Sequence, residues 1–203
     1  MSGTFIIIEG GEGSGKTTII DRLKKELPEV VYTQDPGGTP LGEEIRNLLM
    51  SERTAGIDAR SELLLFLASR AQLVAEVIRP ALESGKDVIS NRFGLSSIAY
   101  QVYGRERPEL LALYRAVSGE ILEGVTPAAC ILLDVSPETG NARVQSRPDV
   151  PTRFDKEALE FHSRVREGYK KHIGEFGRTF VIDAEKPLKQ VWTDVLKTVQ
   201  SLL

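Results

Sequence analysis

The segment Gly10–Thr17, which reads GGEGSGKT, has the residue types and the spacing of a phosphate-binding loop. A strand-like apolar run precedes it and a helical pattern follows it, which is the context that this motif requires. Its glycines allow successive backbone N–H groups to turn inward, and the N-terminus of the following helix adds partial positive charge. Lys16 can then reach the β- and γ-phosphates of a nucleotide, and Thr17 can offer a hydroxyl ligand to Mg²⁺. The segment therefore predicts a nucleoside triphosphate site.

Transfer of a γ-phosphoryl group requires cationic charge around the moving group, and this loop contains no arginine. The segment 143–157, RVQSRPDVPTRFDKE, contains Arg143, Arg147 and Arg153, the first two of which lie four residues apart on one helical face. We expect this segment to be an exposed loop between two helices that closes as a lid and excludes water. A solvated basic loop without a catalytic role is the alternative interpretation.

Short apolar runs alternate with longer amphipathic stretches along the chain. Strands are expected at 4–9, 30–34, 87–91, 129–135 and 179–183; each is rich in β-branched residues and lacks strict alternation, as is typical of strands buried on both faces. Helices are expected at 15–27, 40–50, 59–83, 96–119, 137–147, 156–176 and 187–202. This order predicts an α/β fold in which helices cover both faces of a parallel sheet. No repeat or interdomain linker interrupts the pattern, which indicates a single domain, 1–203.

Length and composition exclude several classes of protein. The 203 residues, 41% hydrophobic and 27% charged, fit a globular domain with a sizeable core. A net charge of −3 does not favour a sequence-independent nucleic-acid binder, which needs a basic face. No apolar run is long enough to cross a bilayer, and the first residues lack the charged region and cleavage site of a signal peptide. Cys130, the only cysteine, is expected to be a buried inert thiol, and we expect a cytoplasmic location.

Further motifs follow the phosphate-binding loop in a fixed order, and they carry a resemblance. They are DPGGT (35–39), ELLLFLASRAQL (62–73), NRFGLSSIAYQ (91–101), ILLDVSPETG (131–140) and REGYKKH (166–172). With them the chain resembles the thymidylate kinase family, bacterial type, nearly from end to end. The resemblance implies a P-loop nucleoside monophosphate kinase-like fold with a five-stranded parallel sheet and a short lid at about 143–155. It also implies a homodimer that passes the γ-phosphate of ATP to thymidine monophosphate, with Mg²⁺, in pyrimidine deoxynucleotide synthesis.

The resemblance assigns roles at the nucleoside end of the acceptor. Glu12 matches an acidic residue that accepts a hydrogen bond from the 3′-hydroxyl of the deoxyribose; a surface Glu that helps to cap the helix is the alternative. Phe66 matches the Phe that stacks on the thymine ring, although a core residue on an apolar helix fits equally well. Arg70 matches the Arg that donates to the base carbonyl, and an Arg among apolar residues otherwise requires an acidic partner. Ser97 and Gln101 match the hydroxyl and the amide that read the remaining edge of the pyrimidine.

It also assigns roles around the phosphates. Arg92 matches the Arg that grips the acceptor phosphate, and Arg46 is expected to reach the same phosphate unless it forms a surface salt bridge. Asp35-Pro36 resembles an acidic-Pro element beneath the acceptor, where a cis peptide is plausible. The motif and the resemblance together predict catalytic roles for Lys16, Arg92, Arg147 and Arg153; ATP contacts from Gly10, Gly11, Glu12, Gly13, Ser14, Gly15, Lys16, Thr17, Thr18 and Arg143; acceptor contacts from Glu12, Asp35, Pro36, Arg46, Phe66, Arg70, Arg92, Ser97 and Gln101; and metal contacts from Thr17 and Asn91.

Three positions depart from the family pattern. Asn91 stands where relatives usually have Asp, so the metal ion should be held less strongly. Gln34 stands where relatives usually have Arg, which removes a cation near the acceptor, and Gln145 replaces a further lid Arg of some relatives. A kinase for another nucleoside monophosphate therefore stays an alternative. A non-catalytic nucleotide-binding paralogue is a second alternative, with Asn91 as its motivation, and a partner-binding face on the helix at 59–83 is a third.

Overall fold

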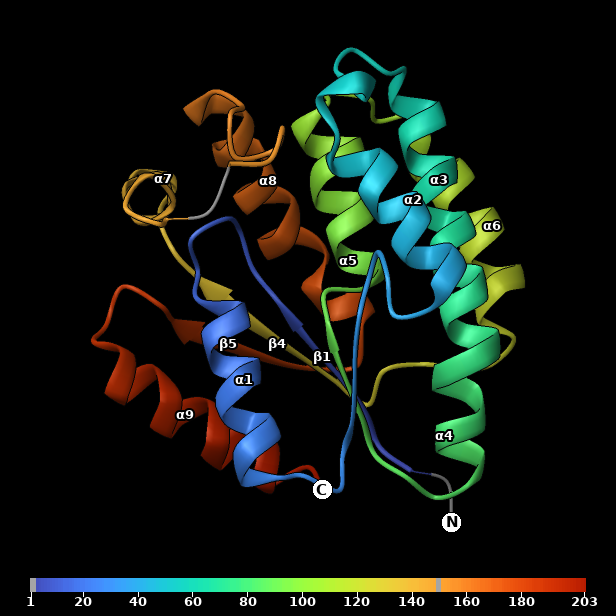
Figure 1. Ribbon diagram of the computed structural model, residues 1–203, viewed down its shortest axis with the longest axis vertical. Coiled ribbons are helices and arrows are strands. Elements are labelled where there is room, and N and C mark those ends of the chain that lie inside the picture. Colours follow the sequence, from blue (N-terminus) through green and yellow to red (C-terminus); the bar gives the residue numbers. More distant parts are fainter. Residues whose placement is uncertain (1–2, 149–150) are drawn as a thin grey trace.

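A five-stranded, all-parallel sheet forms the centre of the protein (Figure 1). The computed structural model describes residues 3–148 and 151–203. Its strands are β1 (Phe5–Glu9), β2 (Val31–Gln34), β3 (Val88–Asn91), β4 (Ala129–Asp134) and β5 (Arg178–Asp183), in the order β2-β3-β1-β4-β5. The predicted fold class and all five predicted strands are confirmed.

The strands differ in how deeply they are buried. The central strands β1, β3 and β4 are buried along almost their whole length, as their apolar sequences predict. The expectation that all five strands are buried on both faces is wrong for the two edges. Residues of β2 are half-buried and most of β5 is exposed, because an edge strand has a neighbour on one side only.

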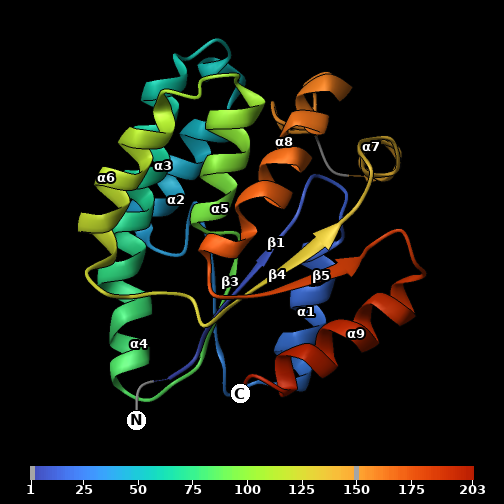
Figure 2. The same cartoon turned by 180° about the vertical axis from the view of Figure 1, so that it is seen from behind.

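Helices cover both faces of the sheet (Figures 1 and 2). On one face, α1 (Lys16–Glu26) and α9 (Leu188–Gln200) pack on the side chains of Ile6 and Ile8. On the other face, Phe5 and Ile7 contact a larger apolar cluster. The helices of that second layer are α2 (Pro40–Met50), α3 (Ala59–Leu73), α4 (Arg79–Glu83), α5 (Gly94–Ser97), α6 (Leu110–Leu122) and α8 (Leu159–His172).

Three predicted helices differ from the observed ones. The helix expected at 59–83 continues from α3 to α4 through a π-helical segment, η2 (Val74–Ile78). This segment ends two residues before Pro80, whose missing N–H and bulky ring do not fit a regular helical turn. The helix expected at 96–119 is interrupted, because α5 leads into the π-helical η3 (Ile98–Gly104) and then into a turn that contains Pro108. The helix expected at 156–176 begins only at Leu159 and ends in the short η4 (Ile173–Glu175). A further short turn, η1 (Glu52–Thr54), follows α2.

The expected lid is only partly exposed. Of the predicted segment 143–157, residues 143–145 belong to α7 (Pro137–Gln145), and positions 149–150 lie outside the described residues. Arg153 and Phe154 are buried, so the expectation of an exposed loop is wrong for this part. The aromatic ring of Phe154 packs against Phe66 and Tyr100 in the larger apolar cluster, which explains the burial.

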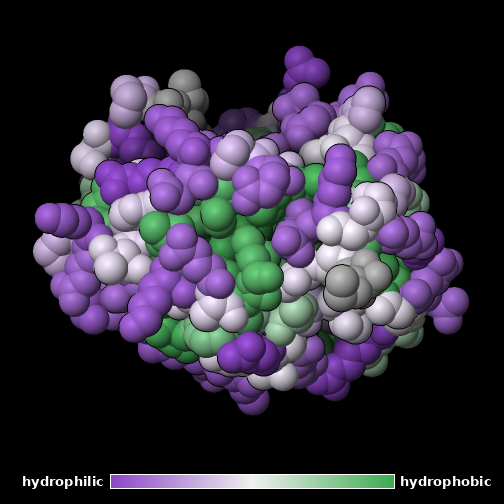
Figure 3. Space-filling model, turned by 90° about the horizontal axis from the view of Figure 1, so that it is seen from below, coloured by the Kyte–Doolittle hydropathy of each residue, from purple (hydrophilic) through white to green (hydrophobic). Residues whose placement is uncertain are grey.

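Figure 3 shows the molecule from below the view of Figure 1, from the side on which the C-terminus lies. Apolar side chains occupy the middle of this face, and polar side chains surround them. Within the described part of the chain, no helix has the length and the apolar character that a membrane span needs. Cys130 is completely buried in β4, and burial raises the pKa of its thiol, as expected for an inert cysteine.

The phosphate-binding loop touches α7 at two glycines. A Cβ atom on Gly140 would lie 2.4 Å from the carbonyl oxygen of Glu12, and one on Gly13 would lie 2.2 Å from the carbonyl oxygen of Gly140. Gly13 also has a φ of 70°, a left-handed conformation that favours glycine. The backbone of α7 therefore rests directly on the loop.

Gly140→Ala should lower the free energy of unfolding by about 1–3 kcal/mol, because backbone must move to admit the methyl group. Urea denaturation measures this effect. Gly119→Ala is the matched control: Gly119 is exposed within α6 and its added Cβ meets nothing within 4 Å. That variant should be unchanged or more stable by about 0.5–1 kcal/mol, since alanine is the better helix former. Equal losses in both variants would contradict the close contact.

Candidate functional site

A cavity of about 440 Å³ lies at the carboxyl ends of β1, β2 and β3. The phosphate-binding loop lines one end of it, and side chains of α3 and η3 line the other. Most of the residues that the sequence singled out line this one cavity; they are Glu12, Gly13, Ser14, Gly15, Lys16, Thr17, Thr18, Asp35, Pro36, Arg46, Phe66, Arg70, Asn91, Arg92, Gln101 and Arg147. Such a position, outside the carboxyl ends of parallel strands, is where α/β proteins bind ligands.

Lys16 holds the phosphate-binding loop in shape from within. Its Nζ donates to the carbonyl oxygens of Gly10 and Gly11, each at 2.8 Å, and to the Ser14 hydroxyl at 3.1 Å. Burial, together with the neighbouring Arg92 guanidinium, lowers the pKa of Lys16 to about 7 against the opposing effect of Glu12 and Glu9. The amine is therefore poised to gain a proton when an anion comes close to it.

Arg92 connects the loop with the helical layer. Its Nη1 donates to the carbonyl oxygen of Gly10 at 2.9 Å and to the Tyr169 hydroxyl at 2.7 Å, and its Nη2 donates to the Glu12 carboxylate at 2.8 Å. The guanidinium also lies over the ring of Tyr100, 5.1 Å from its centroid. These contacts fix a cation at the end of β3 within the cavity.

Glu12 points towards Arg92 and Tyr100. It accepts from the Tyr100 hydroxyl at 2.8 Å as well as from Arg92. Burial favours the neutral acid, but the charges of Arg92 and Lys16 and the Tyr100 hydrogen bond outweigh it and lower the pKa of Glu12 to about 2. Because α1 has no side-chain cap, the alternative interpretation of Glu12 as a capping residue is wrong.

Sequence reasoning missed Glu9, a carboxylate that is completely buried at the end of β1. It accepts hydrogen bonds from the backbone N–H of Phe93 at 2.8 Å, the Ser96 hydroxyl at 2.6 Å and the Tyr169 hydroxyl at 3.2 Å. Burial raises the pKa of Glu9 despite these donors. A charged residue directly after four buried apolar residues was the signal that could have revealed it.

Arg70 and Asp35 form a buried pair at the far end of the cavity. The Nε of Arg70 lies 2.5 Å from Asp35 Oδ2, and its Nη2 donates to the Ser97 hydroxyl at 2.7 Å. The acidic partner that such an Arg requires is therefore present. Arg70 lines the cavity, and its Nη1 is buried without a hydrogen-bond partner in the described part of the chain. The peptide bond between Asp35 and Pro36 is cis.

Phe66 and Gln101 complete this end of the cavity. Phe66 is almost buried and lines the cavity, so the core and the ligand-contact interpretations both fit it. Gln101 is 1% exposed; its Nε2 donates to Glu62 at 2.9 Å, while its Oε1 is buried without a partner among the described residues. Arg70 and Gln101, each with a buried polar atom that lacks a partner in the described residues, thus line one cavity together with the aromatic ring of Phe66.

Arg46 and Gln34 also line the cavity. Nη1 of Arg46 donates to the Pro36 carbonyl oxygen at 3.1 Å, and burial together with Arg92 lowers its pKa. The alternative of a salt bridge for Arg46 is not found within residues 3–148 and 151–203. Gln34, one of the three positions that depart from the family pattern, donates through its side-chain amide to the Glu43 carboxylate at 3.0 Å.

The three arginines of the expected lid occupy different environments. Arg143 donates to the carbonyl oxygens of Ala184 at 2.9 Å and Gly13 at 3.4 Å, so it ties α7 to the phosphate-binding loop. Arg147 is exposed and lines the cavity. Arg153 is buried, and its Nη2 donates to the Glu62 carboxylate at 2.7 Å, away from the loop. Its assignment as a catalytic residue stays a prediction.

Both residues that are predicted to contact magnesium belong to the lining of the cavity. Thr17 and Asn91 both line it, and Asn91 Oδ1 is a buried oxygen without a partner in the described residues. One hydroxyl and one amide oxygen fit a Mg²⁺ ion, which keeps several waters and takes further oxygen ligands from phosphates. No group of three or more acidic, Cys or His side chains that could hold a metal occurs in the described parts of the chain.

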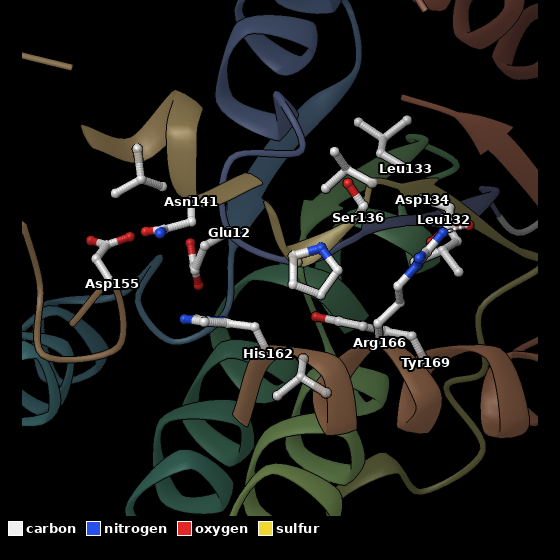
Figure 4. A pocket seen from close by; sticks show the side chains of 15 residues that line it. Glu12, Leu132, Leu133, Asp134, Ser136, Asn141, Asp155, His162, Arg166 and Tyr169 are labelled. Atoms are coloured by element: carbon white, nitrogen blue, oxygen red, sulfur yellow. Dashed lines mark hydrogen bonds and ion pairs between the residues drawn. The ribbon is translucent and has the colours of Figure 1, made fainter. Parts of the chain in front are cut away.

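A second, small cavity of about 20 Å³ lies between the phosphate-binding loop, α7 and α8. Figure 4 shows Glu12, Asn141, Asp155 and His162 around this space. Its volume suffices for about one water molecule. It therefore extends the polar surroundings of Glu12 and does not form a separate ligand site.

The lowered pKa of Lys16 predicts that polyphosphate binding takes up protons. An anion beside the amine favours its charged form, so affinity is highest below pH 7 and falls as the pH rises through 7. Calorimetric titration with inorganic tripolyphosphate at pH 8, in two buffers of different ionisation enthalpy, should show an uptake approaching one proton.

Lys16→Met should abolish this proton uptake, whereas the control Lys25→Met should retain it because Lys25 is an exposed residue of α1. Equal proton uptake by the wild type and Lys16→Met would contradict the assignment to Lys16.

Comparison with known proteins places the chain in a family. Residues 8–195 match the family model described as "Thymidylate kinase". The thymidylate kinase of Bacillus pumilus is 38% identical over 209 residues, which cover 100% of this chain and 98% of the relative. That of Halothermothrix orenii is 40% identical over 209 residues (100% and 99%), and that of Solidesulfovibrio magneticus is 44% identical over 191 residues (89% and 90%). The chain belongs to the thymidylate kinase family.

Proposed function

We propose that this protein transfers the γ-phosphoryl group of ATP to thymidine monophosphate and releases ADP and thymidine diphosphate. Its family membership makes it a nucleoside monophosphate kinase. The observation that carries the choice of acceptor is that one cavity has the phosphate-binding loop at one end and, at the other, an aromatic ring beside residues with unpartnered polar atoms. ATP binds at the loop, and the acceptor base binds between Phe66, Arg70 and Gln101.

The polar groups at the base end favour a thymine ring. Arg70 can only donate hydrogen bonds, so it suits a carbonyl oxygen and rejects an exocyclic amine at the same position. The ring of Phe66 offers a face on which a pyrimidine can stack. The carboxylate of Glu12, a residue of the loop itself, would accept a hydrogen bond from a sugar hydroxyl, and Arg46 and Arg92, which also line the cavity, would bind the acceptor phosphate.

Transfer needs positioning and charge neutralisation more than acid–base chemistry. An oxygen of the acceptor phosphate attacks the γ-phosphorus, a P–O bond forms, and the bond to the β,γ-bridging oxygen breaks to leave ADP. That oxygen is already anionic and needs no strong base. Lys16, Arg92 and Arg147 supply the cations that stabilise the charge of the transferred group.

Mg²⁺ belongs to the proposal, with Thr17 and Asn91 as the residues that would hold it. When bound, the ion would neutralise part of the phosphate charge. Because Asn91 supplies an oxygen without a charge, we expect it to bind the ion less strongly than an Asp would.

A cytoplasmic homodimer is also part of the proposal. Three exposed leucines support an apolar contact between two copies: Leu41 and Leu48 on α2 and Leu64 on α3. They lie on adjacent helices of the same layer. Isolated exposed leucines are common, whereas a group on two packed helices is typical of an interface.

Turnover with a panel of nucleoside monophosphates tests the proposal. With ATP and Mg²⁺, ADP release should be fast with thymidine monophosphate and slower by at least about tenfold with cytidine, adenosine and guanosine monophosphates. Lys16→Ala is the control for contaminating kinases and should lose several orders of magnitude in turnover.

Preference for another monophosphate would keep the mechanism and overturn the choice of acceptor. ATP binding without transfer to any acceptor would favour the non-catalytic alternative. Restoring an acidic side chain with Asn91→Asp would then decide whether the missing charge is the cause.

Arg147→Ala should lower kcat by about 100-fold, since it removes a cation from the transferring group, and should leave the unfolding midpoint unchanged because Arg147 is exposed. Steady-state kinetics and thermal denaturation on the same preparations measure both. The matched variant is Arg153→Ala, which should lower stability by on the order of 3 kcal/mol by removing one partner of the buried Glu62. If Arg153→Ala instead lost turnover at unchanged stability, Arg153 would return to the catalytic set.

A further inference from the structure

Glu62 is a buried carboxylate behind the base end of the cavity. It lies on α3 with 0% exposure and does not line the cavity itself. Arg153 Nη2 donates to it at 2.7 Å, Arg105 Nη2 at 3.2 Å and Gln101 Nε2 at 2.9 Å. Its carboxylate is therefore shared by two cations and one neutral amide.

The two arginines explain how the charge is tolerated in the interior. A buried carboxylate requires partners of opposite charge, and Arg105 and Arg153 supply them. They do not require the third partner: the amide of Gln101 could be replaced by any donor or by water. Compensation of the Glu62 charge therefore does not account for the contact between Glu62 and Gln101.

The contact with Glu62 determines the orientation of the Gln101 side-chain amide. A side-chain amide can turn over and exchange its oxygen and nitrogen, with little difference in shape. A carboxylate has only acceptors, so the nitrogen of Gln101 must face Glu62, since the reverse would place two acceptors against each other. The oxygen therefore faces away from Glu62; it is buried without a partner in the described residues, and Gln101 is one of the residues that line the cavity.

We propose that Glu62 is a positioning residue that fixes the Gln101 amide with its oxygen available to the base, and thereby selects a pyrimidine with a proton on N3. This inference rests on the proposed function. Thymine and uracil have a donor at N3, whereas cytosine has an acceptor there, which would meet the Gln101 oxygen without a proton between them. A site built to hydrogen-bond an N–H group rejects the analogue that lacks it.

The Glu62 carboxylate also connects the selection of the base with the segment 151–155. Arg153 comes from that segment, and its neighbour Phe154 packs against Phe66 at 6.3 Å between ring centroids. The charge of Glu62 therefore binds this segment through Arg153 and also fixes the orientation of the Gln101 amide. The discrimination between bases should depend on Glu62 even though it does not touch the ligand.

Glu62→Gln allows the amide of Gln101 to turn over, because the new side chain can both donate and accept. The ratio of kcat/KM for thymidine monophosphate to that for deoxycytidine monophosphate should fall by about tenfold. Arg70 still opposes the cytosine amine, so discrimination is reduced and not abolished. Glu157→Gln is the matched control, because Glu157 contacts Arg105 but not Gln101, and its ratio should stay within twofold of the wild type.

A ratio unchanged in folded Glu62→Gln would overturn the proposal, because a merely structural role lowers both rates together. If Glu62→Gln does not fold, Glu62→Asp decides: it keeps the charge for both arginines but withdraws the carboxylate from Gln101, and the ratio should fall again. Binding of N3-methylthymidine monophosphate to the wild type needs no variant, and affinity equal to that of thymidine monophosphate would also overturn it. A wild type that does not phosphorylate thymidine monophosphate would instead refute the proposed function, which is a different result.

Discussion

The arrangement of the site depends on the guanidinium of Arg92. Five hydrogen bonds run from this one side chain to Gly10, Glu12, Ser96, Tyr100 and Tyr169, and so connect the phosphate-binding loop with η3 and α8. The residue adopts a φ of 67°, a left-handed conformation that costs about 1 kcal/mol or more for a side chain other than glycine. The hydrogen bonds of the side chain offset this cost, because the turn after β3 directs the Arg92 guanidinium towards the phosphate-binding loop. The sheet register makes this possible, since Ile8 pairs with Asn91, the last residue of β3, and Arg92 follows Asn91 beside Glu9 at the end of β1.

Charges of both signs stabilise the site before any ligand binds. Glu9 holds the backbone after Arg92, Glu12 pairs with Arg92, and Lys16 satisfies the carbonyl oxygens of its own loop. Burial lowers the pKa of Lys16 and raises that of Glu9, whereas the charges of Arg92 and Lys16 and the Tyr100 hydrogen bond lower the pKa of Glu12. Strongly shifted groups at or beside one cavity are typical of functional sites. The polyphosphate therefore meets cations that are already positioned, so little side-chain ordering is left to accompany binding.

The sequence was sufficient for the fold because short apolar runs and helical patterns alternate clearly, and for the loop because its motif lies between a strand and a helix. The interruption near Pro108 and the π-helical segments were not predicted, since the apolar spacing continues through them. The partners of Arg70 and Arg153 could not be predicted either. Asp35 is 35 residues from Arg70 and Glu62 is 91 residues from Arg153, and only the packing of α3 against its neighbours brings them together. Periodicity identifies which face of a helix is buried, but not which buried charges meet.

The close contact between Gly140 and the phosphate-binding loop has a mechanical consequence. With no space for even a methyl group, this contact is a fixed pivot for α7. Gln145, the last residue of α7, follows five residues later, which corresponds to about 7.5 Å along the helix, and Arg147 lies two residues beyond it. A tilt of about 10° around such a pivot displaces the end of an arm of this length by roughly 1.3 Å. A small tilt of α7 about its contact with the phosphate-binding loop would therefore change the distance between the Arg147 guanidinium and a phosphate oxygen at that loop.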